Sequence, residues 1–158
     1  MRRLLTISCL ALLVVMVPQQ ANAQSLCDRL SEIQILPLVG EYVDDTAYNA
    51  FIEADTSALP CLIEKITDTR KMRDPRQVPG YAGIETRVGD VAYFVLVDIA
   101  KIDFIEIFPA RVRERYKTEG VYAYFEFVQK KQNRALLQRR LNEWYRSKYG
   151  ESARGGAT

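Results

Sequence analysis

The fold of this chain is decided by residues 88–99, Val88-Gly89-Asp90-Val91-Ala92-Tyr93-Phe94-Val95-Leu96-Val97-Asp98-Ile99. The β-branched and aromatic side chains of this stretch favour a strand. Its length, with Asp90 placed where it could cap a first turn, equally allows a buried helix. These residues alone leave both structures open, so the fold class depends on the sequence around them.

Upstream of this stretch, the apolar residues recur at helical spacing. They lie three and four positions apart in 26–35, 48–52 and 59–66. Asp44-Asp45 precedes the second of these segments and predicts an aspartate cap. Thr56 or Ser57 is the expected cap of the third, with Pro60 tolerated in its first turn.

Downstream, the spacing again predicts helices. Pro109 begins one that Gly120 ends, and the aromatic residues of 122–127 repeat at helical intervals and are expected in the core. Asn133 is the expected cap of a final amphipathic helix. Its apolar stripe is Leu136, Leu137, Leu141, Trp144 and Tyr145, and its opposite face holds Arg134, Arg139, Arg140, Arg146 and Lys148.

The first 23 residues predict a cleavable signal peptide. An arginine pair precedes an uncharged, mostly apolar run over 4–17, and the Ala-Asn-Ala of 21–23 is a typical peptidase site. That run is shorter than the ~20 residues of a membrane span. We therefore expect a mature protein that begins near Gln24, is periplasmic or secreted, and has no stable membrane insertion. It would form one helical domain over 24–150 with a flexible tail over 151–158.

Two cysteines remain after cleavage, Cys27 and Cys61. In an oxidising compartment they are expected to form a disulfide. A cross-link of that span stabilises a fold by about 3 to 4.7 kcal/mol in the chain-entropy model. A reactive thiol is the alternative, but the chain has no histidine that could lower the pKa of a cysteine.

The charge is divided between two halves of the mature chain. Residues 24–108 carry 15 acidic and 8 basic side chains, and residues 109–158 carry 12 basic and 5 acidic ones. The halves could face each other or solvate ordinary helix surfaces. Alternatively, they form a bipolar surface that steers a charged partner or stacks copies head to tail. A nucleic-acid partner is not expected of an exported protein.

Motifs of common enzymes are missing from the sequence. Without histidine there is no His-based triad and no ordinary zinc site, and no Gly-rich phosphate loop, G-x-S-x-G or C-x-x-C occurs. We expect no cofactor and no metal. A mechanism that uses two carboxylates stays open. Its candidates are Glu53, Asp55, Glu64, Asp68, Asp90 and Asp98.

A long polar segment over 69–87 is the expected recognition loop, because it is punctuated by proline and glycine and exceeds the usual length of a connection. Tyr81 lies in it between small residues, and an aromatic side chain of this kind is enriched at interface hot spots. The basic face of the last helix is the expected second part of the surface. The candidate binding residues are Arg70, Lys71, Arg73, Asp74, Arg76, Tyr81, Arg87, Arg139, Arg140 and Arg146.

Residues 59–68, LPCLIEKITD, resemble the first helix of a HEAT or armadillo repeat, in which a proline is followed by apolar pairs and a closing aspartate. Residues 88–99 resemble the second helix, with an aspartate before a valine and the small Ala92 facing inward. The resemblance implies that 88–99 is a helix and that the fold is all-α. The chain is also similar in type to small exported bacterial proteins, some of which are immunity proteins.

The sequence therefore predicts a compact all-α bundle with a HEAT-like hairpin, one long loop and one disulfide. The predicted function is an exported, non-enzymatic module that binds another protein and is inhibitor-like or immunity-like. A small carboxylate-dependent hydrolase acting on envelope polymers is one alternative, and a structural or assembly protein is another.

Overall fold

The computed structural model describes residues 26–33, 45–72 and 85–150. The predicted signal peptide, the predicted tail and four of the candidate binding residues lie outside these ranges. Those four are Arg73, Asp74, Arg76 and Tyr81.

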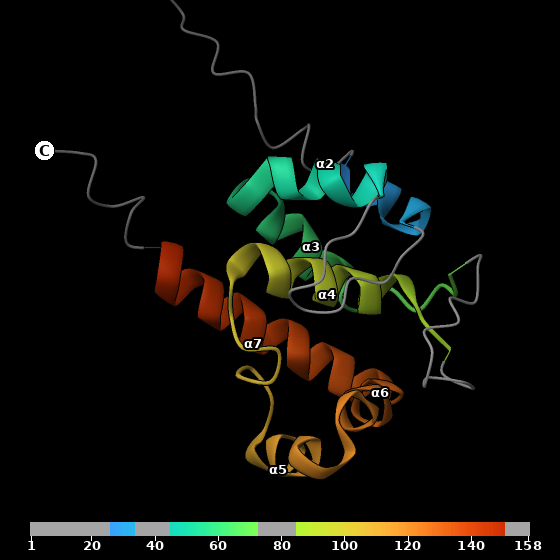
Figure 1. Ribbon diagram of the computed structural model, residues 1–158. Coiled ribbons are helices and arrows are strands. Elements are labelled where there is room, and N and C mark those ends of the chain that lie inside the picture. The colour runs from blue at the N-terminus through green and yellow to red at the C-terminus, as the bar shows by residue number, and fades with distance from the viewer. Residues whose placement is uncertain (1–25, 34–44, 73–84, 151–158) are drawn as a thin grey trace, which may run out of the picture.

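Within the described ranges the structure is all-α, as predicted, and its only β-type pairing is one isolated bridge. In this part of the chain two short 3-10 helices accompany the six α-helices labelled α2 to α7 (Figure 1). In chain order the elements are η1 (Arg29–Glu32), α2 (Thr46–Ala54), η2 (Asp55–Ala58), α3 (Leu59–Lys65), α4 (Val88–Ala100), α5 (Ala110–Glu119), α6 (Val121–Val128) and α7 (Lys131–Tyr149).

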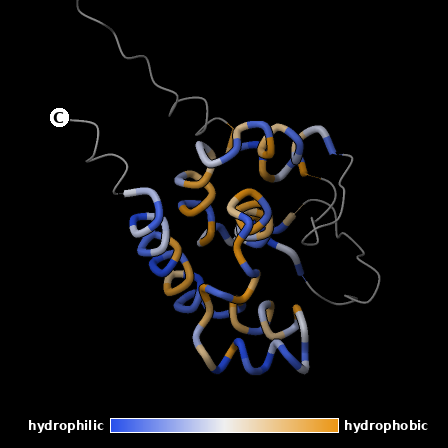
Figure 2. Tube along the Cα trace, turned by 60° about the vertical axis from the view of Figure 1, so that its left-hand side comes forward, coloured by the Kyte–Doolittle hydropathy of each residue, from blue (hydrophilic) through white to orange (hydrophobic). Residues whose placement is uncertain are grey.

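Helix α4 is the central element, which settles the structure of residues 88–99 in favour of helix. The extended backbone of Arg87 precedes it, and the Asp90 carboxylate accepts a hydrogen bond from the Arg87 amide at 2.8 Å. The N-cap residue is thus Arg87, not the Asp90 that the sequence suggested; Asp90 is the third residue of the helix, and its carboxylate caps back onto the Arg87 amide. Of the residues of α4, only Asp98 is not buried. In Figure 2 the helix is the largely orange coil at the centre, with other helices above, beside and below it.

Helix α3 packs directly on α4, and η1 and α2 also contact α4. The end of α3 approaches the start of α4 so closely that a Cβ added to Gly89 would lie 2.4 Å from the Ile66 carbonyl oxygen. Only glycine fits there without a shift of the backbone. The likeness of this helix pair to a HEAT hairpin stays a prediction.

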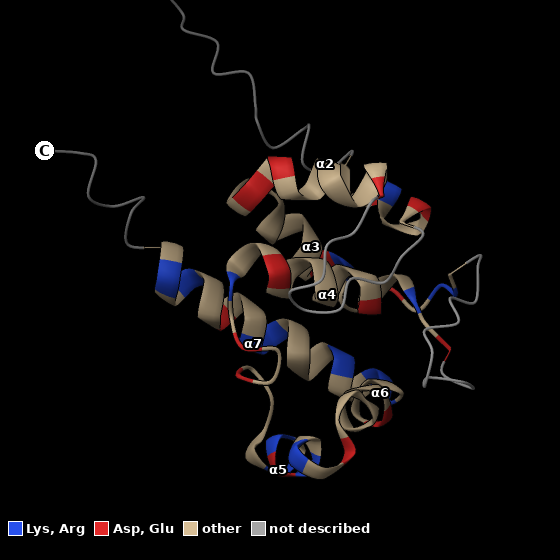
Figure 3. Ribbon diagram, in the orientation of Figure 1, with Lys and Arg blue, Asp and Glu red and all other residues tan. Residues whose placement is uncertain are grey.

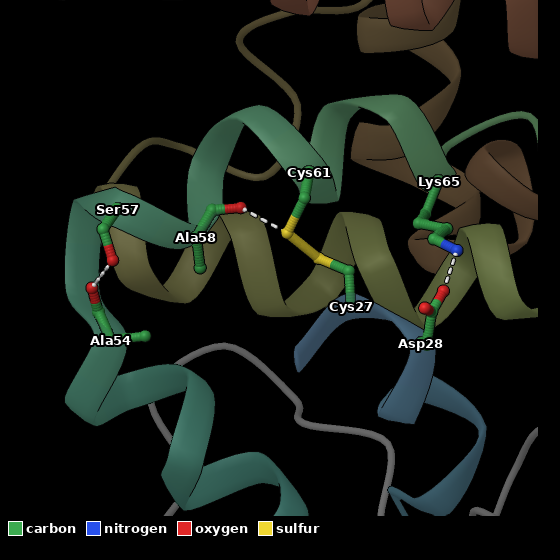
Figure 4. Close-up of a disulfide and its surroundings, with 7 residues drawn as sticks. All are labelled: Cys27, Asp28, Ala54, Ser57, Ala58, Cys61 and Lys65. Carbon is green, nitrogen blue, oxygen red and sulfur yellow. Dashed lines mark hydrogen bonds and ion pairs between the residues drawn. A yellow bond between two sulfur atoms is a disulfide. The ribbon is translucent and has the colours of Figure 1, made fainter. Parts of the chain in front are cut away.

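The disulfide between Cys27 and Cys61 is confirmed, with the two Cα atoms 6.1 Å apart. It fastens the segment before η1 to α3, and both sulfurs are buried against α4 (Figure 4). Beside it, the Lys65 ammonium lies 2.7 Å from the Asp28 carboxylate. The N-terminal part of the domain is thus held by one covalent bond and one surface ion pair.

Aromatic rings fill the core between α4 and the helices that follow it. Tyr93 stacks on Tyr124 with their centroids 5.3 Å apart, and Phe104 and Phe108 pack edge-on around this pair. The prediction that the aromatic residues of 122–127 are core is correct except for Tyr122, which is 47% exposed. The outer face of α6 therefore carries one exposed aromatic side chain.

Three details of the helix termini and faces differ from the sequence predictions. Helix α3 has Ala58 at its cap without a side-chain hydrogen bond, in place of Thr56 or Ser57. Helix α7 begins at Lys131, and Asn133 lies in its first turn, where its side-chain amide donates to the Phe127 carbonyl at 2.8 Å. Arg134 is not on the solvent face, because its side chain is only 4% exposed.

Candidate functional site

A buried ionic cluster joins α4, α6 and α7. The Arg134 guanidinium donates to the Asp90 carboxylate at 2.8 Å, and the Tyr124 hydroxyl donates to the same carboxylate oxygen at 2.8 Å. The other oxygen of Asp90 accepts the Arg87 amide. A second guanidinium nitrogen of Arg134 donates to the Ile66 carbonyl at 3.4 Å, across the space that Gly89 leaves open. We call Asp90, Tyr124 and Arg134 the buried cluster.

Burial dominates the protonation of this cluster. Removal from water raises the pKa of Asp90, and the Arg134 charge with three hydrogen bonds offsets part of that rise. Burial, together with the neighbouring Asp90 charge, also raises the pKa of Tyr124 well above 10. Tyr124 therefore stays a neutral donor at physiological pH.

A pocket of about 270 Å³ opens beside the buried cluster. Its polar wall includes both charged members of the cluster and the side chains of Glu85 and Arg87, and its apolar wall is provided by α6. The complete lining is Glu85, Arg87, Asp90, Phe125, Val128, Gln129 and Arg134. The pocket lies directly beneath the base of the expected recognition loop.

The two ends of that loop are paired by an antiparallel bridge between Lys71 and Arg87. The Met72 amide donates to the Thr86 carbonyl at 3.1 Å, and the Val88 amide donates to the Arg70 carbonyl at 3.0 Å. We call residues 68–71 and 85–87 the charged stem. It connects the segment 73–84 to the first turn of α4.

Ion pairs lie within and between the two segments of the stem. Arg70 pairs with Asp68 at 2.6 Å, and Glu85 bridges Lys71 and Arg87, each at 2.5 Å. These partners lower the pKa of Asp68, mainly through Arg70, and that of Glu85, mainly through Lys71. Both carboxylates therefore carry their charge at neutral pH.

The structure brings together only some of the predicted binding residues. Arg70, Lys71 and Arg87 meet in the charged stem. Arg139 and Arg146 are exposed on α7, whose C-terminal end points away from the stem (Figures 1 and 3). Arg140 is partly buried and donates to the Ile107 carbonyl at 3.1 Å. The described part of the expected surface is thus divided between two regions.

The carboxylates considered for hydrolysis have different surroundings. Asp90 is inside the buried cluster, Asp68 pairs with Arg70, and Asp98 accepts from the Tyr48 hydroxyl. The remaining candidates are exposed: Glu53, Asp55 and Glu64. Among the described residues, no group of three His, Cys, Asp or Glu side chains could hold a metal ion.

A second pocket, of about 180 Å³, was not expected from the sequence. It lies between α5, α6 and the start of α7, on the side of the molecule opposite α2 (Figure 1). We call it the basic pocket, and its lining is Arg111, Val112, Arg115, Ala123, Glu126, Phe127, Lys130 and Asn133. Arg111 and Arg115 are one helical turn apart, which is the one signal in the sequence that could have indicated a shared face.

Comparison with known protein families, with characterised proteins and with solved structures gives no match. In the ranges that the structure describes, no helix is long and apolar enough to cross a membrane. The charged stem and the two pockets are the features of the described residues that could take part in a function.

Proposed function

We propose that this protein is an exported, non-enzymatic module that binds another protein through the charged stem and the segment 73–84 that the stem carries. An inhibitor or immunity-like role is the form of binding that we favour.

The observation that carries this proposal is the attachment of the stem to the core. The amide of Val88, the first residue of α4, bonds to Arg70 of the stem, and the Arg87 amide bonds to the buried Asp90. The base of the segment is therefore fixed to the most deeply buried helix of the domain. Recognition segments are commonly placed on such rigid scaffolds, because less freedom is then lost on binding.

The composition of the segment supports the same conclusion. Residues 73–84 include Arg73, Arg76 and Tyr81, and arginine and tyrosine are enriched among the residues that dominate binding energy. The charged side chains of the stem are paired with one another. The stem is thus a suitable support for a contact that the segment itself makes.

Export is supported by two independent features. The N-terminal 23 residues have the pattern of a signal peptide, and the structure joins Cys27 to Cys61. Disulfides of this kind persist mainly in oxidising compartments. A protein partner would therefore be sought in the periplasm or outside the cell.

A non-enzymatic role is supported by the contacts of Asp90, the carboxylate whose pKa is raised by burial. It is wholly buried and already accepts hydrogen bonds from Arg87, Tyr124 and Arg134. Asp90 lines the larger pocket, but its two carboxylate oxygens are occupied by these three donors, whereas a general acid or base must be free to exchange a proton with a substrate. The contacts of Asp90 instead suit a structural role.

The proposal is tested by replacing residues 73–84 with a Gly/Ser segment of equal length in the full chain. Each protein is purified after export and used to capture partners from envelope extract, with circular dichroism as the check on folding. We expect the replacement to reduce capture of the specific partner at least about tenfold.

The matched control is Glu114→Ser/Lys117→Ser, which removes an exposed ion pair on α5 far from the stem in sequence. It is expected to capture the partner as the unchanged protein does. If the 73–84 replacement and this control capture equal amounts of partner, the stem and its segment do not form the binding site.

A further inference from the structure

We propose that the basic pocket is a second contact site, which receives an acidic side chain from a partner protein. This inference rests on the proposed function in one respect: it assumes that the protein binds another protein. It concerns a surface that is separate from the charged stem.

The size of the basic pocket suits a single side chain. Its volume of about 180 Å³ corresponds to roughly six water molecules at ~30 Å³ each. Pockets for small-molecule ligands commonly measure about 300–1,000 Å³. The floor is apolar, because Val112, Ala123 and Phe127 are buried there.

The rim is charged, and its charges are incompletely paired. Arg115 is engaged twice, by Glu119 at 2.5 Å and by Glu126. The side chains of Arg111 and Lys130, by contrast, make no hydrogen bond or salt bridge in the part of the chain that the structure describes, although the Lys130 charge contributes to lowering the pKa of Glu126. Three cations of the lining therefore share one carboxylate, Glu126, and the side chains of Arg111 and Lys130 keep their hydrogen-bond donors available to a partner.

Separate elements supply the two available cations. Arg111 belongs to the first turn of α5, and Lys130 immediately precedes α7. The Asn133 amide fixes the start of α7 to the Phe127 carbonyl and so keeps Lys130 beside the pocket. The first turn of α7 contains no acidic residue that could neutralise this region. An incoming carboxylate would thus meet a positive potential from more than one direction.

A protein segment fits these features better than a lipid surface does. Tyr122 is exposed one turn before Glu126 on α6, and both tyrosine and arginine are enriched at interface hot spots. Glu126 is charged at neutral pH, because Arg115 lowers its pKa, and it would repel a densely anionic surface. In the described ranges the only large exposed apolar side chains are Ile52 and Tyr122, so no group of them is present to enter a bilayer.

The test measures binding of a fluorescein-labelled peptide that repeats Glu-Glu-Leu-Gly, by fluorescence anisotropy at low salt and at about 0.15 M salt, where screening over ~8 Å weakens non-specific attraction. The full chain, purified after export, is compared with Arg111→Glu/Lys130→Glu. A matched control, Arg29→Glu/Lys148→Glu, makes the same change of net charge on two exposed residues outside the pocket. Since Lys148 is in the last turn of α7, it lies roughly 27 Å along the helix from Lys130 at 1.5 Å per residue.

We expect the pocket variant to bind the peptide at least about tenfold more weakly and the control to change binding at most about twofold, because screened charges at that distance contribute little. A peptide with Gln in place of Glu should bind as weakly as the pocket variant binds the acidic one. Equal losses in pocket variant and control would overturn the proposal, as would equal binding of the Gln peptide.

Two other occupants are separated by the same variants. The first is a membrane. If vesicles containing anionic phospholipid bind the unchanged protein but not the pocket variant, and the peptide does not bind, the pocket is a membrane site and the proposal is overturned. Oligomers of the unchanged protein that dissociate in the pocket variant would assign it to a second copy, with the same consequence. The two proposals can also fail separately. If replacing residues 73–84 does not change partner capture, the proposed role of the stem is wrong, but the result of the peptide experiment is unaffected.

Discussion

Arg134 and Arg111 show how one residue type has opposite roles in two regions of this molecule. Arg134, in the first turn of α7, is buried against the start of α4 and the end of α3 and contacts both Asp90 and the Ile66 carbonyl. Arg111 is exposed at the rim of the basic pocket, without a partner among the described residues. Burial with full pairing makes the first arginine a part of the fold, whereas exposure without pairing leaves the second free to bind.

Among the substitutions that test this comparison, Arg134→Met is expected to change the free energy of unfolding most. The substitution leaves the Asp90 carboxylate buried beside a neutral side chain, and breaking a buried pair in this way costs about 3–5 kcal/mol. Chemical denaturation measures the free energy of unfolding, with Arg139→Met as a control expected to stay within about 0.5 kcal/mol. A loss below about 1 kcal/mol for Arg134→Met would show that the buried cluster does not hold the fold together.

Reduction of the disulfide is expected to have the next largest effect. Cys27 and Cys61 are separated by 34 positions in the sequence, and opening a cross-link of that span removes about 3 to 4.7 kcal/mol in the chain-entropy model. The measurement is the free energy of unfolding with and without reductant. The Cys27→Ala/Cys61→Ala protein should not respond to reductant, and a response there would assign the effect to something other than this bond.

A smaller effect, of unusual sign, is expected from Gly89→Ala. Inside a helix this change is ordinarily favourable by up to about 1 kcal/mol. Here the new Cβ would lie 2.4 Å from the Ile66 carbonyl oxygen and 3.0 Å from the Arg134 guanidinium, so we expect a net loss of about 1–3 kcal/mol.

A double-mutant cycle checks the reason for that loss. If Gly89 makes room for the contact between Arg134 and Ile66, the loss caused by Gly89→Ala should be smaller in an Arg134→Met background. Strict additivity of the two changes would show that the glycine and the arginine act independently.

The smallest expected effect is that of pH on the charged stem. The pKa values of Asp68 and Glu85 lie below their usual 3.8 and 4.5, so their contribution is present at neutral pH and is lost as the pH falls through these lowered values. Burial raises the pKa of Asp90, so protonation of Asp90 does not add to that loss.

Hydrogen exchange at about pH 6 and pH 3, corrected for intrinsic rates, measures this difference between stem and core. Protection of the Met72 and Val88 amides should fall a few-fold on acidification, while amides in the middle of α4 keep theirs. A parallel loss of protection at both places would mean that stem and core open as one unit.

Local patterns predicted the elements of the fold better than the contacts between them. Helical spacing and the Asp45, Pro109 and Gly120 signals located helix ends that the structure confirms. Residues 88–99 were ambiguous because a helix buried on every side shows no periodicity, and the resemblance to a repeat hairpin, rather than the residues, favoured the correct structure. The disulfide followed from compartment chemistry and the number of cysteines.

The two pockets were beyond the reach of sequence reasoning, for physical reasons. Arg134 was assigned to the solvent face because it is charged, although its spacing from Leu137 and Leu141, three and seven positions on, places it on the buried stripe of α7. Its partner Asp90 is 44 positions away, a separation that no local pattern reports. The basic pocket likewise depends on how α5 and α6 turn at Gly120, where φ is +58°.

The central claim is that buried, paired charges maintain the fold while exposed, unpaired ones bind. The most direct test measures the free energy of unfolding and the affinity for the acidic peptide on the same two proteins, Tyr124→Phe and Arg111→Glu/Lys130→Glu. Loss of the Tyr124 hydroxyl, a donor to Asp90, should cost about 1–3 kcal/mol and leave affinity within about twofold. The pocket variant should keep its stability within about 0.5 kcal/mol and lose affinity at least about tenfold. If either variant changes stability and affinity together, the division between the two regions is contradicted.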